Sequence, residues 1–205
     1  MVSEPPRNPR GCDVGAFAGL PLRTLRCGDL WLVAGAAPEA LSESALRAHE
    51  AAVRGIAEAC EACLPARFGA QAASEEALCA ALADRTAELK EALILVRGRE
   101  QMTVRVQEAQ AAREPAPLPE SPGARYLEER RRRDALPELD PLREAVRGLV
   151  RAERVERHQQ LFASVYHLVD KGQSQAYRAA VASVPGLRAA VTGPWPAWSF
   201  APEAL

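Results

Sequence analysis

The sequence of 205 residues has no excess of charge, no long apolar run and no convincing export signal. Its 26 lysines and arginines nearly balance its 27 aspartates and glutamates, which excludes attraction of nucleic acid or anionic lipid by a whole-protein field. The longest apolar run, residues 30–37, is strand-sized and far below the ~18 residues that span a bilayer. Near the amino terminus, apolar residues 14–20 contain two glycines and stop at Pro21. We therefore expect a cytoplasmic protein that recognises its partners through local surface features.

Motifs for nucleotide binding and for nucleophilic catalysis are also missing. The glycines match neither the GxGxxG nor the Walker pattern, and His158 and His167 accompany no recognisable nucleophile elbow. His49 and Glu50 are adjacent, so on a helix their side chains would point about 100° apart and would not face each other as an acid–base pair. We predict that the protein is not an enzyme and carries no cofactor.

The cysteines are odd in number and lack the spacing of a small disulfide framework, so we expect thiols at all five positions: Cys12, Cys27, Cys60, Cys63 and Cys79. Cys60 and Cys63 have the spacing of a redox or zinc pair. No second CxxC supplies further zinc ligands, and the pair falls in the last expected helical turn before Pro65, where the helix dipole disfavours a thiolate. Core thiols are the favoured interpretation, and a thiol-redox or metal-dependent enzyme is the alternative.

The apolar pattern of the first half predicts strands and amphipathic helices. Residues 22–26 and 30–35 read as a hairpin around a tight turn. A helix from residue 44 to the proline at 65 would bury a stripe of apolar side chains: Leu46, Val53, Ile56, Cys60, Cys63 and Leu64. Ser74 is placed to cap a second helix that ends at Gly98 and buries Leu78, Leu82, Leu89, Leu93 and Val96. Residues 102–106 alternate like a half-buried strand, which we expect to complete a first α+β domain.

Four prolines between residues 111 and 123 predict an extended linker between two domains. Beyond it we expect helices over residues 126–133 and from residues 140 and 174, with strands over residues 161–169 and 187–192. The predicted organisation is a disordered leader (1–12), an N-terminal α+β domain (13–110), the proline-rich linker (111–123) and a C-terminal α+β domain (124–205) in which helices cover a small sheet.

Residues 193–200, Gly-Pro-Trp-Pro-Ala-Trp-Ser-Phe, hold three large aromatic rings beside two prolines. Proline restricts the backbone, so this segment should be stiff and extended. Two uses fit such a segment. It could clamp the end of the chain into the core, or it could present aromatic anchors to a protein partner.

This ending resembles the Gly-Pro-Trp-Pro-x-aromatic-Ser-Phe ending of the GvpF/GvpL gas vesicle proteins. His49-Glu50 and the Leu-Pro-Ala-Arg-Phe-Gly stretch at residues 64–69 are similar to further elements of that family. Tyr-Leu with the following arginines at residues 126–133, and Tyr-His-Leu-Val-Asp at residues 166–170, are similar to two more. The resemblance spans about residues 20–202. It departs at residues 1–12, where the family has a Tyr-rich strand, so the first domain is expected to lack or displace an edge strand.

The resemblance implies an N-terminal domain of modified ferredoxin-like fold and a role in gas vesicle formation. As an assembly factor or a minor vesicle component, the chain would contact the small shell protein and other gas vesicle accessory proteins, in the cytoplasm and at the vesicle.

Six residues of the matching motifs are expected to have a structural or a binding role. We predict a structural role for Arg67, Phe68 and Gly69, with Phe68 buried and Arg67 bonded to carboxylates or carbonyl groups. In an extended terminal segment Trp198 and Phe200 would share one face and pack into the core. Trp195 would lie on the other face as a partner-binding residue.

Overall fold

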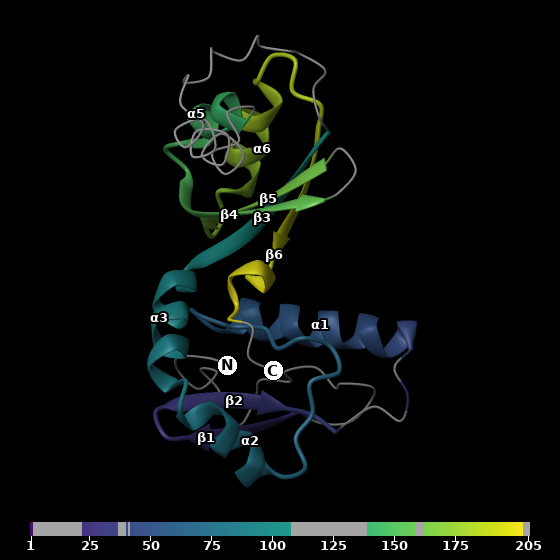
Figure 1. Cartoon of the computed structure of the whole chain (residues 1–205), viewed down its shortest axis with the longest axis vertical. Helices are drawn as coiled ribbons and strands as arrows, with labels where there is room; N and C mark the ends of the chain where they lie inside the picture. The colour runs from purple at the N-terminus through teal and green to yellow at the C-terminus, as the bar shows by residue number, and fades with distance from the viewer. Residues whose placement is uncertain (2–21, 37–39, 41, 108–138, 159–161, 203–205) are drawn as a thin grey trace, which may run out of the picture.

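The computed structural model describes residue 1 and residues 22–36, 40, 42–107, 139–158 and 162–202. Helices and strands in these ranges confirm the predicted α+β class. They form two parts stacked along the long axis of the molecule, a lower one from the first half of the chain and an upper one built on a four-stranded sheet (Figure 1). The expected linker and most of the expected leader lie outside the described residues.

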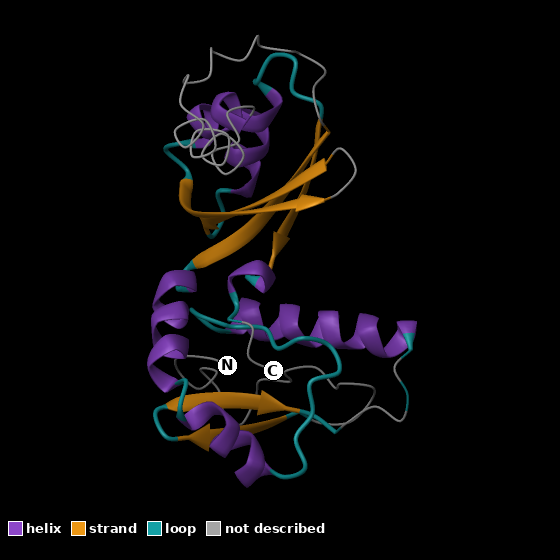
Figure 2. Cartoon of the chain, viewed as in Figure 1, coloured by secondary structure: helices purple, strands orange, loops and turns teal. Residues whose placement is uncertain are grey.

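In the lower part, strands β1 (Arg23–Cys27) and β2 (Leu30–Ala34) pair in an antiparallel hairpin, as predicted. The turn requires Gly28, because its φ of +61° lies in the left-handed region. Helix α1 (Glu43–Ala59) runs across this part of the molecule (Figure 2) and is capped by the Ser42 side chain, which accepts the Ala45 N–H at 3.2 Å. The helix ends before the predicted boundary at Pro65, and Leu46, placed in the buried stripe, is 46% exposed.

The second predicted helix is divided into α2 (Glu75–Ala83) and α3 (Thr86–Val96). Ser74 caps α2 as expected, accepting the Ala77 N–H at 3.1 Å. At the break, the Thr86 hydroxyl donates to the Leu82 and Ala83 carbonyl oxygens at 3.3 and 2.9 Å, so a side chain takes up carbonyl groups at the end of α2. Four of the five predicted apolar side chains are buried across the two helices: Leu82, Leu89, Leu93 and Val96.

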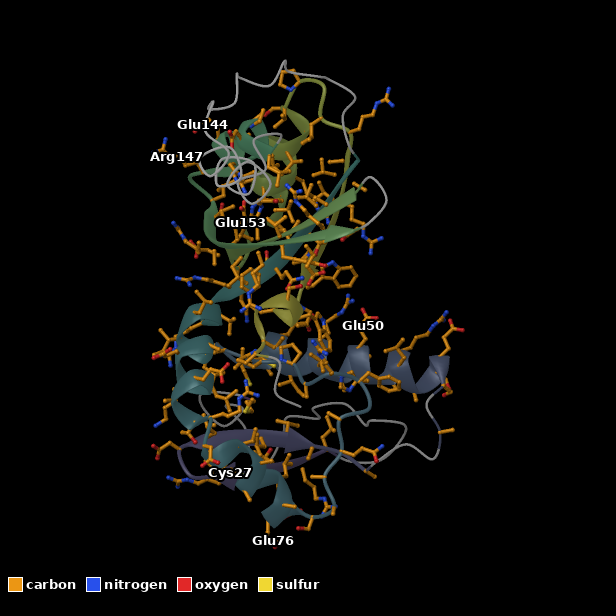
Figure 3. The ribbon with its side chains drawn as sticks, viewed as in Figure 1. Cys27, Glu50, Glu76, Glu144, Arg147 and Glu153 are labelled. Atoms are coloured by element: carbon orange, nitrogen blue, oxygen red, sulfur yellow. A yellow bond between two sulfur atoms is a disulfide. The ribbon has the colours of Figure 1, made fainter. Side chains whose placement is uncertain are left out.

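The expectation of free thiols is wrong for two of the cysteines. Cys27, at the end of β1, and Cys79, in α2, form a disulfide across a sequence separation of 52 residues, with their Cα atoms 5.2 Å apart. Figure 3 labels Cys27 at this junction. Spacing along the chain could not reveal the pair, because tertiary folding brings the hairpin and the helix together. Cys60 and Cys63 are free, and Cys12 lies outside the described residues.

The upper part is an antiparallel sheet in the order β4-β5-β3-β6. Its strands are β3 (Arg99–Gln107), β4 (Val150–His158), β5 (Phe162–Asp170) and β6 (Ala189–Trp195). Helices α5 (Asp140–Val146) and α6 (Ser174–Ala182) cover one face (Figure 2). The core between them consists mainly of buried apolar side chains: Met102, Val104, Leu142, Val146, Val165, Val169, Tyr177 and Val181.

Two features of this sheet differ from the sequence prediction. We placed the strand at 102–106 in the first domain, but β3 pairs with β5 and β6 in the middle of the upper sheet. Alternation indicates that a strand is half-buried and does not indicate which sheet it joins. Strand β4 was missed because charged residues fill most of it, including Glu153, Arg154 and Glu156. The predicted helix at 126–133 lies outside the described residues.

The chain returns from the upper part to the lower one at its carboxyl end. After β6 the terminal segment descends to α1 (Figure 1), where residues Trp198–Phe200 form a 3₁₀ turn. Gly193 is required at the start of this passage, because its φ is +113° and a Cβ atom would lie 2.7 Å from the Gln101 carbonyl oxygen. No helix in the described part of the chain is long and apolar enough to cross a membrane.

Candidate protein-binding surface

Three segments that lie far apart in the sequence meet where the two parts join. The His49 ring on α1 lies with its centroid 5.7 Å from the Phe68 ring and 5.7 Å from the Trp198 ring. His49 Nε2–H donates to the Ala66 carbonyl oxygen at 3.1 Å. One imidazole therefore holds the loop at residues 64–69 against the terminal segment. We call the group of His49, Phe68, Trp195 and Trp198 the motif surface.

Trp195 extends the motif surface along α1. The Arg54 guanidinium lies 5.2 Å from the centroid of its ring, and Arg54 also pairs with Glu50 at 2.6 Å. Glu50 stands on the side of α1 that faces the upper sheet (Figure 3). The Trp195 indole N–H donates to the Thr192 hydroxyl at 3.3 Å. Trp195 is half-buried, so part of an aromatic side chain held by a cation remains accessible.

Hydrogen bonds to the sheet fix the terminal segment. The Ser199 N–H donates to Oε1 of the buried Gln101 at 2.8 Å, and Arg154 Nη1 donates to the Ser199 carbonyl oxygen at 2.7 Å. Phe200 is 2% exposed, and the Arg154 guanidinium lies 5.6 Å from its ring centroid. Phe200 packs in the same apolar cluster as Leu64, which belongs to the loop of residues 64–69, called the motif loop below. The 3₁₀ turn is thus tied to strands β3 and β4 and to the lower core.

The other residues predicted from the motifs differ in how deeply they are buried. Phe68 is half-buried, so our expectation of a buried ring is wrong; its loop lies at the surface beside the exposed Arg67. Gly69 has a φ of +89°, a conformation that favours glycine. Trp198 is half-buried at the edge of the motif surface and is not a core residue. The predicted sharing of one face with Phe200 assumed an extended strand, and a 3₁₀ turn does not alternate in that way.

A cleft of about 290 Å³ opens beside Trp198. We call it the terminal cleft. The motif loop, the chain end and strand β4 line it, with these residues at its walls: Met1, Leu64, Pro65, Ala66, Arg67, Arg154, Glu156, Trp198, Ser199, Ala201 and Pro202. Sequence reasoning missed Arg154 and Glu156 because β4 was not recognised as a strand. Their alternate spacing, which puts both on one face of β4, was the available signal.

The Cys60–Cys63 pair lies at the carboxyl end of α1, where Cys60 caps the helix. Lys171 Nζ occupies this helix end, donating to the Ala57 and Cys60 carbonyl oxygens at 2.8 and 3.0 Å. Burial raises the pKa of the Cys63 thiol, so its reactive thiolate form is disfavoured at neutral pH. Among the described residues, no three His, Cys, Asp or Glu side chains gather where they could hold a metal ion.

A buried polar network lies on the face of the upper sheet that α5 and α6 cover, away from the terminal cleft. His167, 1% exposed, has Nε2 2.8 Å from Glu153 Oε2 and Nδ1 2.6 Å from the Tyr177 hydroxyl. Arg143 on α5 donates to Glu153, which lies between the sheet and the helices (Figure 3). Burial lowers the pKa of His167 and raises that of Tyr177.

The protonation states of this network follow from these contacts. A neutral His167 donates its Nε2–H to the Glu153 carboxylate, and its Nδ1 then accepts the Tyr177 O–H. Although burial alone would raise the pKa of Glu153, hydrogen bonds from Arg143 and His167 leave it below its usual value. The network therefore links β4 and β5 to both covering helices, and its side chains do not line the terminal cleft.

The chain matches one protein family and is similar in fold to solved structures. A family model described as gas vesicle synthesis protein GvpL/GvpF matches residues 1–202. The crystal structure of gas vesicle protein GvpF from Microcystis aeruginosa is similar at a TM-score of 0.71 and 18% identity, covering 98% of this chain and 96% of that chain. The GvpF structure from Anabaena sp. PCC7120 gives 0.67 and 16%, covering 95% and 92%. No curated protein matches the chain. At these identities the structural likeness shows a shared fold.

Proposed function

The chain belongs to the gas vesicle synthesis protein GvpL/GvpF family, and we propose that it acts in gas vesicle assembly, or as a minor vesicle component, by binding the small shell protein. In this proposal it works in the cytoplasm and at the vesicle, together with other accessory proteins, and it binds without catalysing a reaction.

The convergence of the motif segments carries the proposal. His49, the loop with Phe68 and the terminal segment with Trp198 are remote in sequence, yet they meet at one place on the molecule. A purely internal clamp would bury all of its rings, as Phe200 is buried. Trp195, Trp198 and Phe68 are instead half-buried. Partly exposed Trp beside Arg is typical of the anchors that dominate protein–protein binding.

Trp195 is the anchor that we assign to the partner, and a capture assay with immobilised protein and purified shell protein tests this. Trp195→Ala should weaken capture by about 30-fold, because loss of an interface anchor typically costs 2 kcal/mol or more. Trp31 provides a matched control: it is also half-buried, and Arg26 lies 5.8 Å from its ring centroid, but it belongs to β2. Trp31→Ala should capture shell protein as the wild type does.

Unfolding midpoints of both variants must accompany the capture data. If Trp195→Ala and Trp31→Ala capture equally, or if Trp195→Ala unfolds the upper part, the anchor role is wrong and the terminal segment is a clamp. If the wild type captures no shell protein, the proposed function itself is wrong.

The enzyme alternative, which would use Cys60 and Cys63, has a separate test. The double variant Cys60→Ala with Cys63→Ala should support vesicle formation in a complementation assay, since the pair lies at the helix end that disfavours a thiolate. A folded double variant that forms no vesicles, or stoichiometric zinc in the purified protein, would favour the alternative.

A further inference from the structure

We propose that the terminal cleft binds an extended peptide segment that carries a carboxylate, and that Arg154 receives this carboxylate. This inference rests on the proposed function in one respect, which is that the surface binds protein. It adds the chemistry of the partner segment and a recognition residue on β4, a strand that carries none of the family motifs named above.

Arg154 is held in place before any partner arrives. One of its guanidinium nitrogens, Nη1, donates to the Ser199 carbonyl oxygen at 2.7 Å, and the group lies 5.6 Å from the Phe200 ring centroid. Phe200 is buried, and the Ser199 N–H is bonded to Gln101. The guanidinium is therefore bound to a fixed backbone carbonyl group through one of its nitrogens, which leaves its other N–H groups as donors. A planar fork fixed in this way suits a carboxylate, because little side-chain entropy remains to be lost.

The positive charge of Arg154 is not neutralised within the described part of the chain. No described carboxylate lies within ion-pair distance of it, whereas Arg143 and Arg151 pair with Glu153 and Asp170 at 2.9 and 2.6 Å. Arg154 therefore lines the cleft with a positive charge that a carboxylate of a partner can neutralise.

Two other charged side chains line the cleft. One is Arg67, on the loop of residues 64–69. Glu156 is the acidic residue there, and its carboxylate accepts the Tyr166 hydroxyl at 2.8 Å. Glu156 is therefore held against β5, whereas the Arg154 guanidinium keeps N–H donors that a ligand can use.

The walls indicate a peptide instead of a free inorganic anion. Leu64, Pro65, Ala201 and Pro202 are apolar, and Trp198 offers a half-exposed ring. A volume of about 290 Å³ lies at the lower end of the range for ligand pockets. It has room for one or two side chains of an extended segment, which would place an acidic residue at Arg154 and an apolar neighbour against Trp198.

A random heptapeptide library displayed on phage tests the inference without prior choice of a partner. Selection on the wild type should enrich peptides with Asp or Glu next to an apolar residue. A selected peptide, synthesised with blocked ends, should bind about 10- to 100-fold more weakly to Arg154→Gln, the effect of losing a hydrogen bond to a charged group. The same loss is expected when Gln replaces its acidic residue. Arg154→Lys should bind with intermediate affinity.

Arg151→Gln is the matched control, because Arg151 lies on the same strand and is exposed like Arg154, but its charge is paired with Asp170. It should bind the selected peptide as the wild type does. If Arg151→Gln and Arg154→Gln weaken binding equally, the net charge of the protein explains the effect and the inference is wrong. Selection of peptides without acidic residues would also overturn it. If Arg154→Gln fails to fold, the comparison of acidic and amide peptides on the wild type decides the question.

The shell-protein capture assay separates this inference from the proposed function. Capture of shell protein by a wild type that selects no acidic peptides would refute the cleft chemistry and leave the function standing. Selection of acidic peptides that depends on Arg154, without capture of shell protein, would support the cleft and refute the shell protein as the partner.

Discussion

Phe200 should contribute more to stability than any other ring of the terminal segment. It is 2% exposed, and the cluster around it includes Leu64 and Leu168, so it joins the lower core to the upper sheet. Phe200→Ala removes about 1.5–3 kcal/mol of burial free energy. A cavity term of about 24 cal/mol per Å³ adds on the order of 2 kcal/mol if most of the ring volume stays empty. We expect a loss of about 3–5 kcal/mol in the free energy of unfolding.

Urea unfolding followed by circular dichroism measures this loss. With a slope of about 2 kcal/mol per molar urea, the midpoint should fall by about 2 M. Ile94→Ala is the control, because Ile94 is a large apolar residue that is 67% exposed, and its substitution should change stability by less than about 0.5 kcal/mol. Equal midpoints for Phe200→Ala and Ile94→Ala would refute the reasoning, since they would show that Phe200 does not hold the two parts together.

Three further perturbations have defined outcomes. Replacing Cys27 and Cys79 by Ala should lower the free energy of unfolding by about 4 kcal/mol, the chain-entropy value for a closed loop of this length, and a thiol reductant should lower the wild type equally; no difference would mean that the pair is reduced in solution. Lys171→Met removes two charge-assisted hydrogen bonds at the end of α1 and should cost about 1–2 kcal/mol, whereas Lys90→Met, at an exposed pair with Asp29, should leave the urea midpoint nearly unchanged. Because burial lowers the pKa of His167, the unfolded state binds more protons than the folded state below pH ~6.5, and stability should fall with acidification there by at most about 1.4 kcal/mol per pH unit. Urea midpoints from pH 7 to pH 5 should show a shallower slope in His167→Gln, and an identical slope would exclude His167 as the titrating group.

The sequence was most informative where one element determines its own structure. The hairpin around Gly28 and the cap at Ser74 follow from turn and capping chemistry within a few residues, and both were predicted. The division of the second helix was not, because leucines continue the apolar face across the break. The place of β3 was mistaken for a similar reason: its alternation is local information, and its partners β5 and β6 lie at least 55 residues further along the chain, as the separation of Gln107 and Phe162 shows.

Part of the candidate surface could be predicted from the sequence. The motifs alone identified Trp195, Phe68 and Trp198, but they could not show that Phe68 and Trp198 lie against the His49 ring. Arg154 could not be found in this way, since it lies in a strand whose charged residues conceal its alternation. Its role in the fold depends on the Ser199 carbonyl oxygen, 45 residues away in the sequence.

The conformation of the terminal segment depends on such distant contacts. Two prolines favour an extended backbone locally, yet residues Trp198–Phe200 turn because Gln101 and Arg154 bind the N–H and the carbonyl group of Ser199. The same turn directs Phe200 into the core and leaves Trp198 half-exposed beside His49. The two uses that the sequence left open, a clamp and a display of aromatic anchors, are therefore compatible in one segment: the buried Phe200 ring fixes the backbone that carries the half-buried rings of Trp195 and Trp198.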